Sequence, residues 1–169
     1  QAGFDQQLPC ASHTLDLASC RRQLSSGELG RDVRYHESIT STMDEARDQA
    51  SRGAPHGAMV IAEEQTAGRG RRGRQFYSPA RENLYFTLVL RLPLAVHRRL
   101  PIVLPLAVAR AIRAEGADAR VKWPNDILYA DRKLGGMLTE ARIDADHTRD
   151  VVFGLGLNLN SQRRDWPPE

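Results

Sequence analysis

The amino-acid sequence predicts an α+β fold in which a mixed β-sheet is flanked by helices, and three observations support this. The chain has 169 residues, a length that suits one domain with a single core. Hydrophobic residues make up 41% and charged residues 27%, a balance typical of globular proteins. Segments with helical spacing of apolar residues alternate with runs of short apolar strands. We expect the helices to lie on one side of the sheet.

The first half of the chain contains signals for two helices and three strands. A short helix is predicted at 15–24, in an otherwise poorly periodic N-terminal stretch. A second helix is predicted at 43–52, because Ser41 or Thr42 can cap its start and Gly53 follows its end. The other predicted elements of this half are strands at 34–39, 58–62 and 84–92 and a polar loop at 65–79.

The second half begins with a helix and continues with strands. Apolar residues fall at helical spacing over 98–115, with Gly116 as a stop, and Pro105 should bend or delay this helix. A tight turn at 131–132 is expected to join the middle pair of the strands that follow. These four strands are predicted at 120–123, 127–130, 133–141 and 151–157.

Several classes of protein are disfavoured by composition. The longest apolar run, 100–112, is shorter than the roughly 20 residues of a membrane span. The sequence shows no export signal, so we expect a cytoplasmic protein. Cys10 and Cys20 do not form a disulfide framework or a zinc motif, and we expect both to be reduced and structural. Residues 1–33 are interpreted as an extension too short for a complete three-helix DNA-binding domain.

Basic residues are distributed unusually. The formal net charge is +3, and of the 24 basic residues only Lys122 and Lys133 are lysines. These two lysines either survive by chance or stand where a compact ammonium cannot be replaced by a planar guanidinium.

The segment Gly68–Arg74, with the sequence GRGRRGR, carries the strongest chemical signal. Its glycines allow the backbone to approach a ligand closely, and its arginines supply donors suited to carboxylate and phosphate oxygens. It matches neither the Walker phosphate loop nor the dinucleotide fingerprint. Three interpretations remain open from these residues alone: a solvated loop, a nonspecific nucleic-acid contact and a specific site for a small anion.

Three further motifs accompany this loop. Pro124 bends the chain after a strand and would present Asn125 and Asp126 at the strand end. In Lys133–Leu138 a lysine precedes two glycines, which would leave strand backbone bare beside an ammonium group. Gly154–Asn158 repeats the glycine-bared strand and ends in an amide. Each motif also has an ordinary structural interpretation, as a turn, a bulged strand or an exposed lysine.

Taken together, the motifs resemble one family, the biotin protein ligases, also called biotin–acetyl-CoA-carboxylase ligases. The resemblance covers residues 34–160 and rests on Ser-Thr at a helix start, GRGRRGR, KWPND, KLGG and GLGLN in the family's order. It implies a catalytic domain over 34–169 with the fold shared by lipoate ligases and, more distantly, class II aminoacyl-tRNA synthetases. Relatives continue beyond the motif that ends at Asn158, so this domain is expected to be truncated at its C-terminus.

The resemblance also implies an ATP-dependent ligase reaction in two steps. Biotin and ATP form biotinyl-5′-AMP and pyrophosphate, and a lysine of the biotin carboxyl carrier protein of acetyl-CoA carboxylase then takes the biotinyl group. ATP and biotin are the implied substrates, with Mg²⁺ expected alongside ATP and the metal ligands unidentified. A homodimer is possible, and neither DNA nor a membrane is an expected partner.

The resemblance assigns roles to individual residues. The implied catalytic residues are Lys133, Arg69, Arg71 and Asp126. The implied biotin-binding residues are Ser41, Thr42, Met43, Gln65, Gly68, Arg69, Gly70, Arg71, Lys133, Gly135, Gly136, Gly154 and Gly156. The implied ATP-binding residues are Arg69, Arg71, Arg74, Phe76, Asn125, Asp126, Lys133 and Asn158.

Two positions depart from the family pattern. Met43 stands where many relatives have asparagine, and Phe76 stands where relatives often have tryptophan, which leaves a smaller ring to stack on adenine. Three alternatives to a biotin ligase are a lipoate-type ligase, a domain that only binds biotin, and an arginine-rich nucleic-acid-binding module. The complete GRGRRGR loop and KWPND favour biotin over lipoate.

Overall fold

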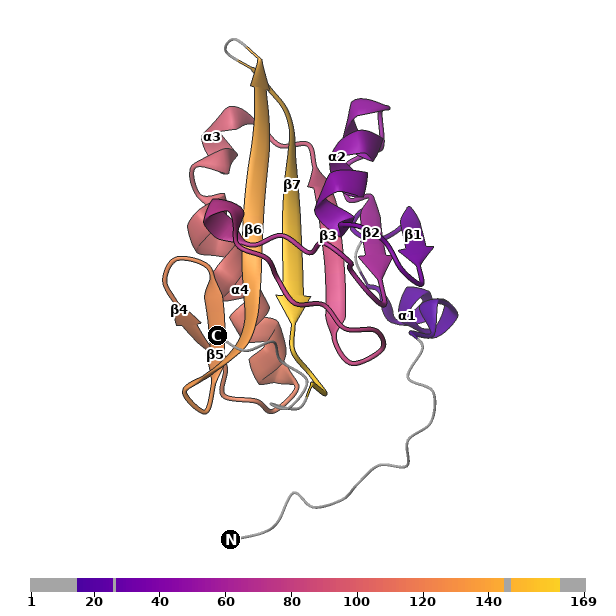
Figure 1. Cartoon of the computed structure of the whole chain (residues 1–169). Helices are drawn as coiled ribbons and strands as arrows, with labels where there is room; N and C mark the ends of the chain where they lie inside the picture. The colour runs from indigo at the N-terminus through magenta and orange to yellow at the C-terminus, as the bar shows by residue number, and fades with distance from the viewer. Residues whose placement is uncertain (1–14, 26, 145–146, 162–169) are drawn as a thin grey trace, which may run out of the picture.

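The structure, a computed structural model, describes residues 15–25, 27–144 and 147–161 and is built on a seven-stranded sheet (Figure 1). β1 and β2 pair in parallel and all other neighbours are antiparallel, which confirms the predicted mixed sheet and α+β class. In spatial order the strands are β1 (Val33–His36), β2 (Met59–Ala62), β3 (Leu84–Leu90), β7 (His147–Leu157), β6 (Arg132–Asp144), β5 (Asp126–Tyr129) and β4 (Arg120–Lys122).

Most helices form where the sequence predicts them. The structure adds two short elements that the sequence did not predict, the α3 turn and the 3₁₀ turn η1 within the arginine-rich loop. The α4 helix continues through Pro105, which lies near its N-terminal end, rather than being delayed until after it. The helical elements are α1 (Leu17–Gln23), α2 (Thr42–Ser51), η1 (Arg71–Gly73), α3 (Leu94–His97) and α4 (Leu100–Ala114).

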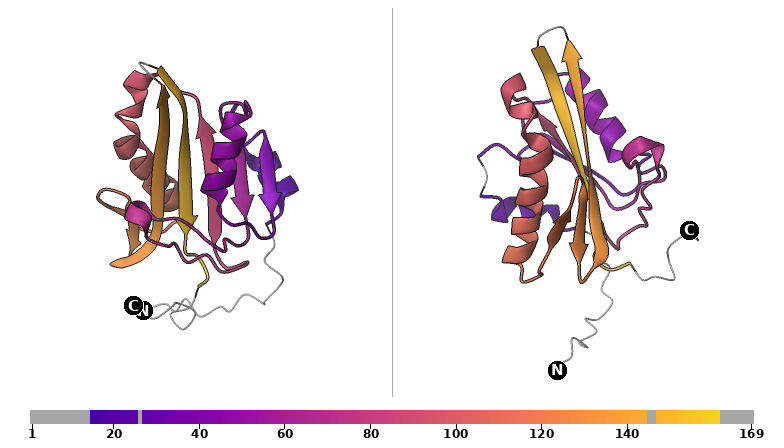
Figure 2. Two further views of the ribbon diagram at one scale, coloured as in Figure 1. Left: turned by 45° about the horizontal axis from the view of Figure 1, so that its top comes forward. Right: turned by 90° about the vertical axis from the view of Figure 1, so that its left-hand side faces the viewer.

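The helices cover both faces of the sheet, so the expectation of helices on one side is wrong. Figure 2 shows α2 on one face and α3 and α4 on the other. The physical reason lies in β7, whose central residues are buried on both faces. Phe153 and Leu155 pack in the core beneath α4, whereas Val152 packs in the core beneath α2. A strand buried on both sides needs a helix on each side to exclude water.

Two local predictions can be checked at the ends of elements. The β5–β6 hairpin turns at Ala130 and Asp131, both with positive φ, one residue earlier than expected. Cys20 is a free, exposed cysteine on α1 and is not part of the core, whereas Cys10 lies outside the described residues. In the part of the chain that the structure describes, no helix has the length and hydrophobicity needed to cross a membrane.

Candidate active site

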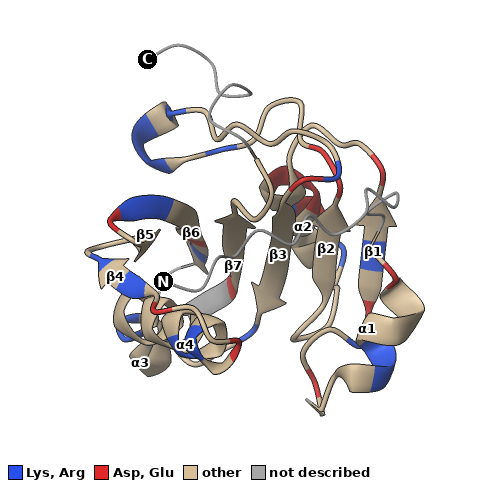
Figure 3. Cartoon of the chain, turned by 90° about the horizontal axis from the view of Figure 1, so that it is seen from below, with Lys and Arg blue, Asp and Glu red and all other residues tan. Residues whose placement is uncertain are grey.

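A cavity of about 390 Å³ lies on the α2 face of the sheet, bordered by the arginine-rich loop, the start of α2 and strands β5, β6 and β7. Figure 3 shows the basic stretch of the loop across from the basic first residues of β6. Of the residues predicted for the site, those that line this cavity are Thr42, Met43, Gln65, Arg69, Gly70, Arg71, Arg74, Phe76, Asn125, Asp126, Lys133, Gly136, Gly154 and Gly156. Those outside its lining are Ser41, Gly68, Gly135 and Asn158.

Lys133 reaches the cavity because β6 contains a β-bulge. Ile127 pairs with Gly135 and Leu128 with Lys133, which leaves Leu134 without a partner on β5. Paired residues share a face, and Ile127 and Leu128 point to opposite faces, so the bulge turns Lys133 away from the face of Gly135. Lys133 then lies on the cavity side, where its Nζ donates to Asp126 Oδ1 at 2.9 Å.

Gly135 and Gly68 allow backbone segments to approach each other closely and do not form part of the cavity wall. A Cβ at Gly135 would lie 2.4 Å from the carbonyl oxygen of Gly156, so this glycine permits β6 and β7 to approach. A Cβ at Gly68 would lie 2.4 Å from the carbonyl oxygen of Phe76. The absence of a side chain at Gly68 therefore lets the two ends of the loop lie against each other. The interpretation of two adjacent glycines as one bare surface is therefore wrong, because only Gly136 of that pair lines the cavity.

The protein's own side chains cover the two glycines that β7 contributes to the cavity wall. A Cβ at Gly154 would lie 2.6 Å from Met43 Sδ, and one at Gly156 would lie 2.5 Å from Phe76 Cε1. The Phe76 ring packs edge-on against Tyr85, with centroids 6.3 Å apart. The glycines thus make room for a methionine and an aromatic ring that form part of the cavity wall, instead of leaving the strand bare.

Tyr85 holds this wall in place. Its hydroxyl donates to the carbonyl of Pro79 at 3.1 Å and accepts from Asn83 Nδ2 at 2.8 Å. Burial raises the pKa of Tyr85, so the hydroxyl stays protonated and remains a donor.

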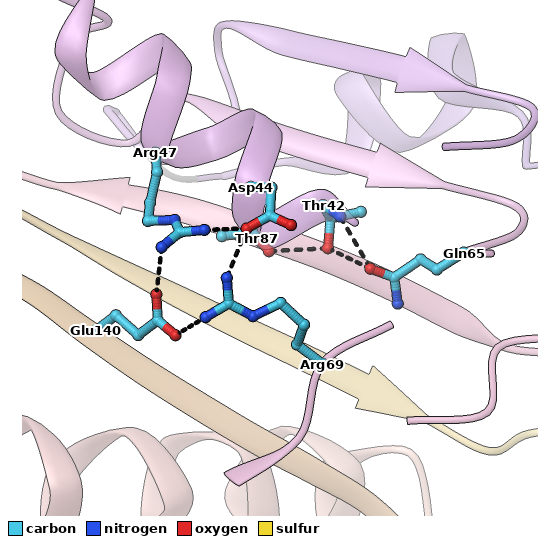
Figure 4. Close-up of polar contacts among 7 residues, drawn as sticks. All are labelled: Thr42, Asp44, Arg47, Gln65, Arg69, Thr87 and Glu140. Atoms are coloured by element: carbon cyan, nitrogen blue, oxygen red, sulfur yellow. Dashed lines mark hydrogen bonds and ion pairs between the residues drawn. The ribbon is translucent and has the colours of Figure 1, made fainter. Parts of the chain in front are cut away.

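A chain of hydrogen bonds fixes the end of the cavity that is lined by the uncharged side chains of Thr42 and Gln65, here called the neutral end (Figure 4). The backbone nitrogen and the hydroxyl of Thr42 both donate to Gln65 Oε1 at 2.9 Å. Thr87 Oγ1 donates to Thr42 Oγ1 at 2.9 Å, and Gln65 Nε2 donates to Ser78 Oγ at 3.0 Å. The Gln65 amide is therefore oriented before any ligand arrives. Sequence reasoning missed Thr87, although a polar residue within an apolar strand was a visible signal.

Ser41 occupies the N-cap position of α2 but does not cap it. Its backbone is extended and its side chain makes no capping hydrogen bond, so the expected capping by Ser41 is absent. The residue is buried, and its Oγ has no hydrogen-bond partner within the described part of the chain. Leaving a buried hydroxyl unpaired costs roughly 1–3 kcal/mol, which a polar ligand group could recover.

The four arginines of the loop have different partners. Arg69 lies between the carboxylates of Asp44 and Glu140. Arg71 donates instead to the neutral Asn125 Oδ1 at 2.9 Å. Arg72 and Arg74 form no ion pair with any described residue. Their charge, with that of Arg71, makes one end of the cavity suited to anions.

Asn125 and Asp126 stand where the sequence predicts them, at the beginning of β5 after the bend at Pro124. Asn158 has a different position. Its backbone nitrogen donates to the carbonyl of Leu134 at 2.7 Å, so it supports the bulged start of β6 from outside the cavity lining.

The chain is similar in sequence and in fold to known proteins. Residues 35–158 match the model of the Biotin/lipoate A/B protein ligase family. The "Bifunctional ligase/repressor BirA" of Bacillus subtilis is 37% identical over 158 residues, which cover 92% of this chain and 49% of that protein. The "Biotin--[acetyl-CoA-carboxylase] ligase" of Mycobacterium tuberculosis is 34% identical over 164 residues, 92% of this chain and 60% of that protein.

A solved structure gives the same result. The biotin protein ligase of Leishmania major in complex with biotinyl-5-AMP is 31% identical and superposes with a TM-score of 0.62, over 82% of this chain and 62% of that one. The present chain spans about half the length of the curated relatives it matches. The family model covers most of the chain, and the chain therefore belongs to the Biotin/lipoate A/B protein ligase family.

Proposed function

We propose that this chain is the catalytic domain of a biotin protein ligase, which makes biotinyl-5′-AMP from biotin and ATP and transfers the biotinyl group to a lysine of a biotin carboxyl carrier protein. The observation that carries the proposal is the division of one cavity into a basic end and a neutral hydrogen-bonding end. Arg71, Arg72, Arg74 and Lys133 line the basic end, and Thr42 and Gln65 line the neutral end. This division supports a substrate that is an acid with a polar but uncharged far end.

The neutral end favours biotin over lipoate. The urea of biotin offers one carbonyl acceptor and two N–H donors, which suit the hydroxyls of Ser41 and Thr42 and the amide of Gln65. The dithiolane ring of lipoate has no comparable donor or acceptor and would leave the buried Ser41 hydroxyl unpaired. We assign Thr42 and Gln65, which line the cavity with Met43 beside them, to the urea, together with the unpaired hydroxyl of the neighbouring Ser41, which is buried behind the lining.

The basic end suits the first step. An oxygen of the biotin carboxylate attacks the α-phosphorus of ATP, and the bond from that phosphorus to the oxygen of the β-phosphate breaks, so pyrophosphate leaves. Both reactants are anions, and the cations lower the cost of bringing them together. We assign Lys133 to the developing charge on the α-phosphate and Arg71 and Arg74 to the phosphates, because preorganised charge stabilises the transition state. Phe76 is assigned to the adenine face.

In the second step a lysine amine of the carrier protein attacks the carbonyl carbon of biotinyl-5′-AMP. The bond from this carbon to the phosphate oxygen breaks, AMP leaves and the amine nitrogen loses a proton, which gives an amide. Asp126, paired with Lys133 and partly exposed, is our candidate for the contact with the ribose or the incoming amine. Because the reaction consumes ATP, we propose that it takes place in the cytoplasm.

Magnesium is expected to arrive with ATP. Among the described residues, no group of three or more His, Cys, Asp or Glu side chains could hold a metal ion. Mg²⁺ usually keeps several waters and is held by substrate phosphates with one or two carboxylates. The cavity fits that mode, with Asp126 as the carboxylate that lines it and the phosphates as the other ligands.

The test is ATP–pyrophosphate exchange with and without biotin, combined with calorimetric titration of biotin in the presence and absence of ATP. We expect exchange that depends on biotin and biotin binding that strengthens with ATP. Exchange supported by lipoate instead of biotin would contradict the substrate assignment. Biotin binding without exchange would reduce the chain to a binding domain. Affinity for nucleic acid that falls steeply with salt, without biotin binding, would favour the nucleic-acid module.

A further inference from the structure

We propose that Arg69 is a positioning residue that anchors the arginine-rich loop through an ion-pair ring, which we define as Asp44, Arg47, Arg69 and Glu140. This assignment replaces the direct ligand role that the family resemblance gave to the Arg69 side chain. The expected effect of Arg69 on catalysis rests on the proposed function, whereas its expected effect on the position of the loop rests on the structure alone.

The ring joins three separate parts of the chain (Figure 4). Asp44 and Arg47 belong to the first turns of α2, Arg69 to the loop and Glu140 to β6. Arg69 Nη1 lies 2.5 Å from Asp44 Oδ1, and Arg69 Nη2 donates to Glu140 Oε1. Arg47 completes the ring, because it pairs with Asp44 and its Nη1 lies 3.4 Å from Glu140 Oε2. Each carboxylate thus contacts both guanidinium groups.

The charges within the ring cancel, which separates Arg69 from the other loop arginines. Two guanidinium groups and two carboxylates sum to zero, so the ring adds no net positive charge to the cavity. An anionic substrate that approached the Arg69 guanidinium would also approach the carboxylates of Asp44 and Glu140 and be repelled by them. No described carboxylate is paired with Arg71, Arg72 or Arg74. Within the loop, the substrate-facing charge therefore belongs to these three arginines.

The backbone explains why an anchor at Arg69 matters. Arg69 and Gln75 form an antiparallel bridge, and Gly70 N donates to the carbonyl of Arg74 at 2.7 Å. The loop is thus a small hairpin with Arg69 at its base and the substrate-facing arginines, residues 71–74, at its tip. Fixing the base against α2 and β6 fixes the position of the tip relative to Lys133.

The partial exposure of the ring indicates that it controls the position of the loop rather than the stability of the whole domain. Its side chains are 27–45% exposed, so each ion pair contributes little to global stability. A network of four charges can still hold a surface loop that has few apolar contacts. We therefore expect removal of the ring to loosen the loop while the sheet stays folded.

The test compares Glu140→Gln and Arg69→Lys with a matched control, Asp48→Asn. Glutamine keeps the shape of Glu140 without its charge, and lysine keeps the charge of Arg69 without the fork that spans two carboxylates. Asp48 lies on α2 outside the ring, where it pairs with Arg52 at 2.6 Å. We measure tryptic cleavage after the loop arginines without ligand, the melting temperature, and the Michaelis constants in biotin-dependent pyrophosphate exchange.

Both ring variants should be cleaved in the loop several times faster than the wild type, with a melting temperature within about 2 °C of it. Their KM values for biotin and ATP should rise on the order of tenfold, with kcat at saturation nearly unchanged and the control variant unaffected. A lower KM in Glu140→Gln would identify Arg69 as a masked ligand and overturn the proposal, as would unchanged cleavage in both variants. If the wild type shows no exchange, the proposed function fails and cleavage alone decides on the ring.

Discussion

The two faces of the sheet are built differently from alternate residues of the same strands. On β7, Phe153 and Leu155 pack beneath α4 in the larger of the two cores. Their neighbours Gly154 and Gly156 face α2 and line the cavity. The α4 face buries apolar area along its length and so supplies much of the free energy of folding. The α2 face has a smaller core at Val152 and gives up packing only where the cavity lies. Stability and chemistry can therefore be altered separately along one strand.

β3 shows the same division. Leu88 and Leu90 belong to the core beneath α4, whereas Thr87 faces α2 and joins the hydrogen-bond chain of the cavity. We expect substitutions at the cavity to change binding or catalysis, and substitutions in the core beneath α4 to change the free energy of unfolding.

The largest effect on catalysis is expected for Lys133→Ala on the cavity face. Loss of a preorganised cation beside the reacting phosphate should lower biotin-dependent exchange on the order of a hundredfold to a thousandfold. The melting temperature should stay close to that of the wild type, because the lysine is half exposed. Lys122→Ala is the matched control, since Lys122 is the other lysine of the chain and is exposed on β4. Normal exchange in Lys133→Ala would remove this residue from the mechanism.

The largest effect on stability is expected on the opposite face. Phe153 is 3% exposed, and Phe153→Ala should lower the free energy of unfolding by about 3–5 kcal/mol. Urea denaturation followed by circular dichroism measures this loss, and Phe153→Leu, which keeps most of the volume, should lose much less. A loss below about 1 kcal/mol for the alanine variant would show that this face does not dominate stability.

The smallest effect is expected for Thr87→Val, a substitution that should change both stability and biotin binding. Valine keeps the shape of threonine but cannot donate to Thr42 Oγ1, so the free energy of unfolding should fall by about 1 kcal/mol. Biotin binding by calorimetry should weaken slightly, because Thr42 is less firmly oriented. Thr139→Val on β6 is the control, because Thr139 is exposed. Stronger biotin binding in Thr87→Val would contradict the orienting role.

The sequence predicted the elements well, because their signals are local. The apolar periodicity of α4, and the glycine after α2, depend only on neighbouring residues. The hairpin of β6 and β7 extends beyond the predicted strands, to Asp144 and back from His147. That extension depends on pairing between strands, which the polar sequence near the turn did not indicate.

Features of the site that join distant segments were not predictable. The motifs placed Asn125, Asp126 and Lys133 together correctly, because they lie on one hairpin. The ion pair of Arg69 with Glu140 joins residues 71 positions apart, and no local pattern reports it. The cover of Gly156 by Phe76 likewise depends on how the loop folds back over the sheet. The prediction that all helices lie on one side of the sheet was wrong for the same reason, because it depends on contacts between distant segments.

The bulge at Leu134 makes the spacing of residues as important as their identity. The unpaired residue sets the phase of the strand, so the amine at 133 and the glycine at 136 point the same way despite an odd separation. A homologue that kept every residue type but lacked this one position would aim its ammonium at the hydrophobic interior. Conservation of a lysine in an aligned column is therefore not enough to infer that its amine reaches the cavity. The number of residues between this lysine and the following glycines has to match as well.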